Sequence, residues 1–343
     1  MNFLKIILLP TVPVYALIIW VRNFLFDKKI FKSIKVNAKV ISVGNITVGG
    51  SGKTPVTIYI TELFKKNKMN VGILSRGYRR KSHGYVLVSD GKDILTSVDK
   101  SGDEMYHTVL DCKAPAAVCE NRVIGARKLI SDTSVDTIIL DDAFQHRWIA
   151  RDINIMVIEQ RFLTDESFFV NNLLLTGTMR EPLSSIKRAD AVIINRKFTS
   201  SKSIPEKYSK HFKDIKVFNG FYQAVGFYDL KSNTQLGLNE FEGQKSLVIS
   251  GIARPYSFLN VLSQTKVDTE NKIIFRDHKH YTQKDVQLIR KAFYSTNSHS
   301  VVTTEKDAVK LTNFSKELDD IDIYFLKIKF KMDDEDSFKG FIF

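Results

Sequence analysis

Short apolar runs alternate with segments of helical pattern along most of this chain. The first group of runs lies at 40–43, 71–75, 116–118, 135–140, 153–158 and 191–194. Helix signals stand between several of them, as at 55–68, which ends in lysines, and at 121–131. Strands that alternate with helices in this way predict an α/β fold, with a parallel sheet and helices on both of its faces.

The same pattern begins again near Val217, after a stretch rich in lysine and serine that is typical of a linker. We expect 191–194 to be the last strand of the first sheet, and 323–330 to be a strand that returns either to the second sheet or to the linker. The second group of apolar runs lies at 246–250, 273–275 and 300–302. The sequence predicts three parts: an N-terminal segment, a larger α/β domain and a smaller α/β domain with a C-terminal strand or tail, at 1–38, 39–215 and 216–343.

Residues 3–21 are nearly all apolar, with Lys5 as their one charge and two prolines. This length is near the lower limit for a membrane span. The segment could cross the membrane, lie in the interface as a helix anchored by Trp20, or form a buried core helix. The prolines and Lys5 favour the interfacial helix. We therefore predict an N-terminal membrane-associated helix.

Charge and cysteine content narrow the class of protein. Residues 1–40 hold seven cations and one acid, which contribute +6 of the formal net charge of +13. Cations that flank an apolar segment favour anionic lipid and hold the following chain on the cytoplasmic side. No RNA-binding aromatic signature or zinc-finger spacing is present, so we predict no nucleic-acid partner. Cys112 and Cys119 form no disulfide framework and are typical of cytosolic thiols.

The stretch 40–54, VISVGNITVGGSGKT, carries the strongest chemical signal. A strand, a glycine-rich loop, Lys-Thr and a helix start are the context of a phosphate-binding loop, with Thr47 where a glycine is usual. Its backbone N–H groups would bind phosphate, Lys53 would reach the β- and γ-phosphates, and Thr54 would ligate Mg²⁺. ATP and Mg²⁺ are thus the predicted cofactors, and the alternative is a glycine-rich turn without a ligand. The predicted nucleotide-binding residues are Thr47, Val48, Gly49, Gly50, Ser51, Gly52, Lys53 and Thr54.

Further polar groups follow other strands of the predicted sheets. Asp141 and Asp142 end an apolar run, the position from which phosphate-loop proteins hold Mg²⁺, and the pattern does not decide between them. Arg76 opens a basic loop that could bind an anionic substrate or be a solvated face. Asp103 and Glu104 stand in a helix's first turn, where the helix dipole alone explains acids. His278 by itself is typical of a solvated loop.

The motifs together resemble the tetraacyldisaccharide 4′-kinase family, the lipid A 4′-kinases of Gram-negative bacteria. The resemblance accounts for Thr47, since the family loop is similar to Thr-Val-Gly-Gly-x-Gly-Lys-Thr. This chain departs from the family at Ala143, where glycine is expected, and before Arg180, where Gly-Pro character is missing. The matching motifs fall in order across nearly the whole chain, at Gly44–Pro55, Ser75–Tyr78, Gly102–Glu104, Asp141–His146, Arg180–Pro182, Asp277-His278 and Thr304–Asp307.

The resemblance implies phosphoryl transfer from ATP to the 4′-hydroxyl of an acylated glucosamine disaccharide 1-phosphate held in the membrane. It makes Asp103 the candidate base for that hydroxyl, assisted by His278 from the second domain, with Lys53 neutralising the transferring phosphoryl group. It also implies an enzyme at the cytoplasmic face of the inner membrane, and we see no sign of an obligate protein partner. The second-rank candidates are Arg76, Glu104, His146, Arg180 and Glu181.

Two other classes remain open at this point. One is a soluble phosphate-loop enzyme, such as an ATP-dependent ligase or a small-molecule kinase, against which the apolar segment 3–21 argues. The other is a membrane-tethered nucleotide switch or chaperone, which would need Mg²⁺ and nucleotide but no base for an acceptor hydroxyl.

Overall fold

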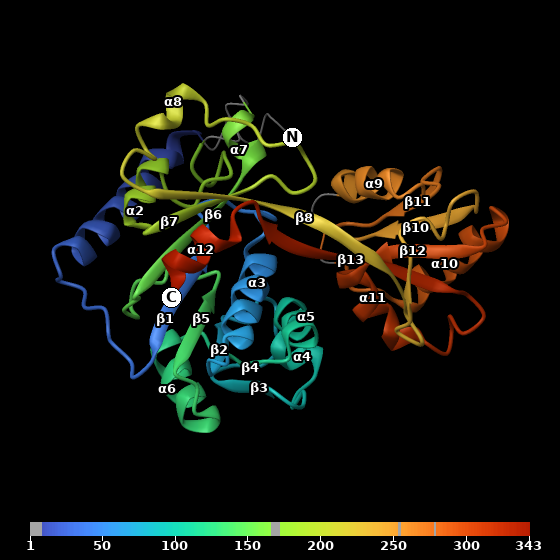
Figure 1. Ribbon diagram of the computed structural model, residues 1–343, viewed down its shortest axis with the longest axis horizontal. Helices are drawn as coiled ribbons and strands as arrows, with labels where there is room; N and C mark the ends of the chain where they lie inside the picture. The colour runs from blue at the N-terminus through green and yellow to red at the C-terminus, as the bar shows by residue number, and fades with distance from the viewer. Residues whose placement is uncertain (1–8, 166–171, 253–254, 278) are drawn as a thin grey trace. The chain divides into compact units, whose positions relative to one another are not determined.

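The chain forms two compact units in the computed structural model, which describes residues 9–165, 172–252, 255–277 and 279–343 (Figure 1). The first unit comprises Met1–Phe221 and Phe330–Phe343, and the second comprises Tyr222–Lys329. The chain leaves the first unit inside strand β8 (Lys216–Asp229) and returns to it inside strand β13 (Ile323–Met332). The C-terminal residues, which the sequence pattern grouped with the second domain, thus lie with the first unit.

A parallel sheet forms the middle of the first unit, in the order β8-β7-β6-β1-β5-β2-β4-β3. Its strands pair in parallel except β3, which runs antiparallel to β4. The prediction that 191–194 ends this sheet is wrong, because β8 pairs in parallel with β7, with Ala191 opposite Lys216. The other strands are β1 (Lys39–Gly44), β2 (Val71–Ser75), β3 (Val86–Asp90), β4 (Pro115–Val118), β5 (Thr137–Asp141), β6 (Ile153–Glu159) and β7 (Ala191–Asn195).

Helices cover both faces of this sheet, as predicted. Successive residues of β2 point to opposite faces: Ile73 packs with Met105 of helix α5, and Leu74 packs with Leu129 of helix α6. Besides the helices near the two chain ends, which are described below, the helices of the unit are α3 (Lys53–Lys66), α4 (Val98–Ser101), α5 (Asp103–Cys112), α6 (Arg122–Thr133), α7 (Gln160–Thr164), α8 (Glu206–Ser209) and the 3₁₀ helix η2 (Leu183–Arg188).

The C-terminal helix α12 (Glu335–Ile342) packs beside α3 (Figure 1). The rings of Phe64 and Phe343 lie 4.8 Å apart, and Tyr59 donates a hydrogen bond to Glu335 over 3.1 Å. Phe338 is fully buried. The chain terminus therefore contributes to the core around the helix that follows the glycine-rich loop.

The second unit is the smaller α/β unit expected from the sequence. Its sheet has the order β11-β10-β12-β13, and each pair is parallel. Residues such as Ile249, Ile289 and Val301 form its core. The short strand β9 (Gln235–Leu236) pairs antiparallel with β8. The other elements of the unit are β10 (Ser246–Ser250), α9 (Pro255–Gln264), β11 (Asn271–Ile274), α10 (Gln283–Ser295), β12 (Ser300–Thr304), α11 (Glu305–Leu311) and the 3₁₀ helix η3 (Thr312–Phe314).

Helix α2 (Val12–Asp27), preceded by the 3₁₀ helix η1 (Leu9–Thr11), lies against the first unit (Figure 1). The segment Leu9–Asp27 is long and apolar enough to cross a membrane by length and composition. Phe26 is buried, whereas Leu17 and Trp20 are 58% and 62% exposed. The alternative of a buried core helix is therefore wrong, and residues 3–8 lie outside the described part of the chain.

Candidate active site

The predicted site residues of the first unit gather at the carboxyl edge of its sheet. β1 lies between β6 and β5, and β5 lies between β1 and β2. The glycine-rich loop follows β1, Asp141 and Asp142 end β5, and the basic loop follows β2. Parallel strands bring these three chain segments together at the edge where open α/β sheets bind ligands.

The glycine-rich loop adopts the backbone shape that its glycines allow. Gly49 and Gly52 have φ of +99° and +96°, in the region that side chains rarely adopt. A Cβ built on Gly49 or Gly50 would meet no atom within 4 Å, so the loop borders open space. α3 begins at Lys53, directly after the loop, and its N-terminal N–H groups are available to an anion there.

Two asparagines that the sequence analysis did not select hold this loop from behind. The Asn45 amide donates to the Ser51 hydroxyl over 2.8 Å, and the Asn195 amide donates to the Ser51 carbonyl over 3.1 Å. All three residues are buried. Asn45 stands within the quoted family motif, but Asn195 ends a strand distant in sequence, so no local signal identifies it.

A backbone segment that is distant in sequence borders the same loop. Val48 N–H donates to the Thr178 carbonyl over 2.7 Å, and Arg180 N–H donates to the Ile46 carbonyl over 2.6 Å. These bonds place the Arg180 side chain beside the carboxylates that end β5. The missing Gly-Pro character before Arg180 does not prevent this pairing.

Asp142 is paired with two cations of the site. Arg180 Nη1 donates to its two oxygens over 2.9 and 3.1 Å, and Lys53 Nζ lies 3.7 Å from Oδ1. Burial works to raise the pKa of Asp142, but Lys53 and Arg180 outweigh it and the pKa is lowered. Asp142 also has a positive φ of 48°, whereas Ala143 does not, which explains how Ala143 replaces the expected glycine.

Asp141 is buried, and Lys53 lowers its pKa by less than burial and the neighbouring carboxylates raise it. Its Oδ1 accepts a hydrogen bond from the Thr57 hydroxyl over 3.2 Å. Burial, together with Glu104 and Asp142, raises its pKa to about 6. A divalent cation would relieve this crowding of negative charge, and carboxylate and hydroxyl oxygens are the ligands that Mg²⁺ prefers. Asp141, Asp142 and the Thr54 hydroxyl are thus residues whose oxygens could hold a magnesium ion.

Asp103 and Glu104 open α5, next to the loop that follows β2. Gly102 has a φ of +83°, and a Cβ there would lie 2.7 Å from the Tyr78 carbonyl, so the two segments are in close contact. The Asp103 carboxylate accepts the Glu104 N–H over 3.0 Å, and both residues are partly exposed. Since His278 lies outside the described residues, its pairing with Asp103 stays a prediction.

The basic loop is only partly available to a ligand. Arg80 donates to the Gly84 carbonyl over 2.6 Å and to Glu120 over 2.5 Å, and Lys81 pairs with Asp99 at 2.9 Å. Arg76 is exposed. The predicted anion-binding role is therefore open to Arg76, while Arg80 fixes the loop itself.

His146 is half-buried and Glu181 is fully buried, so neither is freely open to a ligand. Burial, and next the nearby Arg122, lower the pKa of His146 to about 4, so it is neutral at physiological pH. Glu181 is fully buried and bonded to Asn23, Ser185 and Arg188. Its position behind Arg180 indicates a supporting role.

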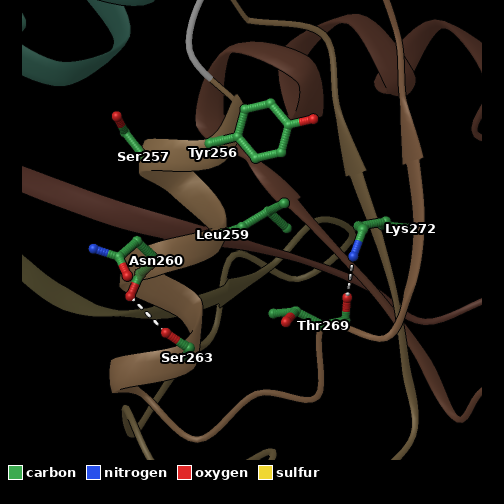
Figure 2. Close-up of a pocket in the computed structure, with 7 residues that line it drawn as sticks. All are labelled: Tyr256, Ser257, Leu259, Asn260, Ser263, Thr269 and Lys272. Atoms are coloured by element: carbon green, nitrogen blue, oxygen red, sulfur yellow. Dashed lines mark hydrogen bonds between the residues drawn. The ribbon is translucent and has the colours of Figure 1, made fainter.

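A separate open pocket of about 480 Å³ lies in the second unit, between α9 and β11 (Figure 2). Part of its polar lining is already bonded internally, since Lys272 donates to the Thr269 carbonyl over 3.3 Å and Ser263 donates to the Asn260 carbonyl over 2.8 Å. Among the residues that the structure describes, no predicted site residue lines it. Its lining residues are Tyr256, Ser257, Leu259, Asn260, Ser263, Thr269 and Lys272.

The parallel sheet, the glycine-rich loop and the Lys53–Asp142 pair define a nucleotide-binding α/β protein of the phosphate-loop class. The family model described as tetraacyldisaccharide-1-phosphate 4′-kinase matches residues 4–343. The chain belongs to this family, which confirms the resemblance seen in the motifs.

Individual relatives agree with the family match. The chain is 35% identical to a tetraacyldisaccharide 4′-kinase from Chlorobium phaeovibrioides, over 90% of this chain and 87% of that one. It is 34% identical to one from Flavobacterium psychrophilum, over 96% and 93% of the two chains. The crystal structure of the "apo" form of LpxK from Aquifex aeolicus in complex with ATP superposes with a TM-score of 0.79 at 30% identity, over 99% of this chain and 98% of that one.

Proposed function

We propose that this protein transfers the γ-phosphoryl group of ATP to the 4′-hydroxyl of tetraacyldisaccharide 1-phosphate, the kinase step of lipid A biosynthesis. Membership of the 4′-kinase family carries this reaction. The observation on the molecule itself that best supports it is the open glycine-rich loop, with Lys53 Nζ 3.7 Å from Asp142 at its end. A switch or a ligase would share the loop but not the family match.

The charged groups around the glycine-rich loop and the start of α5 have distinct roles in this proposed reaction. Lys53 and Arg180 would neutralise charge that develops on the transferring phosphoryl group. Asp141, Asp142 and Thr54 would hold Mg²⁺, which supplies further positive charge to the phosphate oxygens. The unbalanced charge at Asp141 makes it the better candidate for direct contact with the ion. Asp103 would accept the proton of the 4′-hydroxyl, with His278 assisting.

The outward face of α2 supports action at a membrane surface. Leu17, Ile18 and Trp20 are exposed there, and exposed lysines follow at 28, 29, 32 and 35. Apolar side chains beside cations suit an anionic bilayer interface. Because α2 bonds to the first unit at both ends, through Tyr15 and Asp27, we infer that it lies in the interface on the cytoplasmic face.

The test is transfer of labelled γ-phosphate from ATP to a tetraacylated disaccharide 1-phosphate in detergent micelles. Wild type should form a phosphorylated lipid, and Lys53→Ala should lose turnover by about a hundredfold or more, because an interaction that forms in the transition state is removed. Lys92→Ala, at an exposed lysine, serves as the matched control and should behave as wild type. Absence of product with wild type, while ATP still binds, would overturn the proposed reaction.

A further inference from the structure

Helix α2 has its polar residues on the face that contacts the protein. Apart from the indole of Trp20, the polar side chains of Val12–Asp27 are Tyr15, Arg22, Asn23 and Asp27. Their spacing of seven, one and four residues places them on one face of a helix. All four bond to the first unit, whereas the opposite face is apolar and exposed. A membrane anchor alone would not require this polar face.

Asn23 makes the most connected of these contacts. Its amide nitrogen donates to Glu181 over 3.1 Å, its amide oxygen accepts from Arg188 over 3.0 Å, and its backbone carbonyl accepts from Arg147 over 3.2 Å. Asparagine is a poor helix former, and burying its polar amide against the protein is costly without hydrogen-bond partners. These costs are offset only by the contacts that its amide makes.

Glu181 is the receiving group, and it is fully buried. The same carboxylate oxygen that accepts from Asn23 also accepts from Ser185 over 3.0 Å and from Arg188. A buried carboxylate depends on such donors, since a lost partner leaves its charge poorly compensated. Removing the Asn23 amide would therefore disturb Glu181 and the backbone that carries it.

That backbone leads directly to the reacting centre. Arg180 precedes Glu181 and holds Asp142, and its N–H pairs with the strand end next to the glycine-rich loop. The Tyr15 hydroxyl donates to the Arg180 carbonyl over 2.9 Å. Tyr15 and Asn23 of α2 therefore fix two consecutive residues, Arg180 and Glu181. The first of these carries the guanidinium that binds Asp142.

We propose that Asn23 is a positioning residue for phosphoryl transfer: through Glu181 and Arg180 it ties the membrane helix to Asp142. This inference rests on the proposed kinase function. By this inference α2 is both an anchor and a support for the active site. The packing of α2 against the rest of the first unit and the position of Arg180 then depend on each other. Tyr15 acts in the same way through the Arg180 carbonyl.

The test is a double-mutant cycle with Asn23→Ala and Arg180→Ala, assayed in detergent micelles where anchoring to a bilayer does not limit turnover. Asn23→Ala should lower kcat about tenfold. Asn23→Gln keeps the amide, so its kcat should lie between those of Asn23→Ala and wild type. In the Arg180→Ala background Asn23→Ala should cost no further activity, because a residue that acts through Arg180 has nothing left to act on. Asn239→Ala, at an exposed asparagine, is the matched control.

The outcomes separate this inference from the proposed function. An inactive wild type would overturn the kinase assignment. An active wild type with Asn23→Ala within twofold of it, or with losses that multiply in the double variant, would overturn the positioning role. If Asn23→Ala fails to fold by thermal melt, Tyr15→Phe takes its place in the cycle, with an expected loss of about threefold for one removed hydrogen bond.

Discussion

Gly44 and Phe144 are packed so closely that no side chain fits between them. A Cβ built on Gly44 would lie 2.5 Å from the backbone nitrogen of Phe144. The loop after β5 folds back over the end of β1, where Ala143 N–H donates to the Val43 carbonyl over 3.3 Å. This approach keeps the two aspartates beside the glycine-rich loop.

Gly44→Ala should therefore destabilise the protein and lower turnover. Because the clash is with backbone, it cannot be relieved by a rotamer change, and we expect a loss of about 1 to 3 kcal/mol in the free energy of unfolding. Urea titration measures it. Gly340→Ala is the control, since a Cβ in α12 meets no atom within 4 Å and should stabilise the helix slightly. Equal stability of the two variants would contradict the close contact.

Asp141→Asn should stabilise the metal-free protein while it abolishes turnover. The folded protein binds the Asp141 proton more tightly than the unfolded chain, with a pKa raised from 3.8 to about 6. Stability is therefore lost as the pH rises from about 4 through 6, by at most about 3 kcal/mol. At pH 7.5 with a chelator, Asp141→Asn should melt several degrees above wild type.

The control for Asp141→Asn is Asp93→Asn, at an exposed aspartate that should leave the melting temperature unchanged. Mg²⁺ should raise the melting temperature of wild type and have little effect on Asp141→Asn, because binding to the folded state stabilises it. A melting temperature of Asp141→Asn below that of wild type would show that the carboxylate is compensated within the protein.

Continuous apolar runs explain why most of the first sheet could be predicted. β1 and β2 are almost entirely buried, so their sequences are largely apolar, with Ser42 as the one polar residue inside β1. β8 was missed as a sheet member because its early residues alternate, with Phe218 and Gly220 buried between more exposed neighbours. From the sequence alone, such a strand cannot be told from the end of the preceding linker, because the strand with which it pairs is not known.

The site was predictable where its residues are adjacent in sequence and hidden where the fold brings them together. The glycines and the Lys-Thr pair identify the loop 47–54 from the sequence alone. Asn195 and Asn23 carry no such signal, because each acts on a group more than a hundred residues away. Glu181 was selected only as a second-rank candidate through the family resemblance, and the sequence did not show that the fold buries it fully.

Arg180→Ala should move the acid limb of the kcat/KM profile to higher pH. Arg180 is one of the cations that keep the pKa of Asp142 low against the effect of burial. Without it that pKa rises, Asp142 becomes protonated at higher pH, and the ionised form that the reaction needs is lost earlier on acidification. The measurement is kcat/KM for ATP as a function of pH, with Arg161→Ala, at a mostly exposed arginine, as control. An unmoved acid limb would argue against the Arg180–Asp142 pairing.

Asp103→Ala should lose turnover and keep nucleotide binding. Asp103 is the first residue of α5, beside the loop after β2, and does not belong to the glycine-rich loop. Removing a base for the acceptor hydroxyl affects the chemical step by about 10² to 10⁴ in kcat. ATP affinity, measured by equilibrium titration, should change less than threefold. A switch or chaperone would instead keep its activity in this variant.

Leu17→Ser combined with Trp20→Ser should weaken membrane association without unfolding the protein. Both side chains are more than half exposed on the outward face of α2, and the polar contacts of the helix lie on its other face. Their removal takes apolar area from the lipid contact but leaves Asn23 and Tyr15 bonded. Sedimentation with anionic vesicles should show a loss of binding of about tenfold or more, whereas kcat in detergent micelles should stay within twofold of wild type. Leu110→Ser, at an exposed leucine of α5, is the control and should bind vesicles as wild type does. Unchanged vesicle binding by the double variant would mean that another surface holds the protein at the membrane.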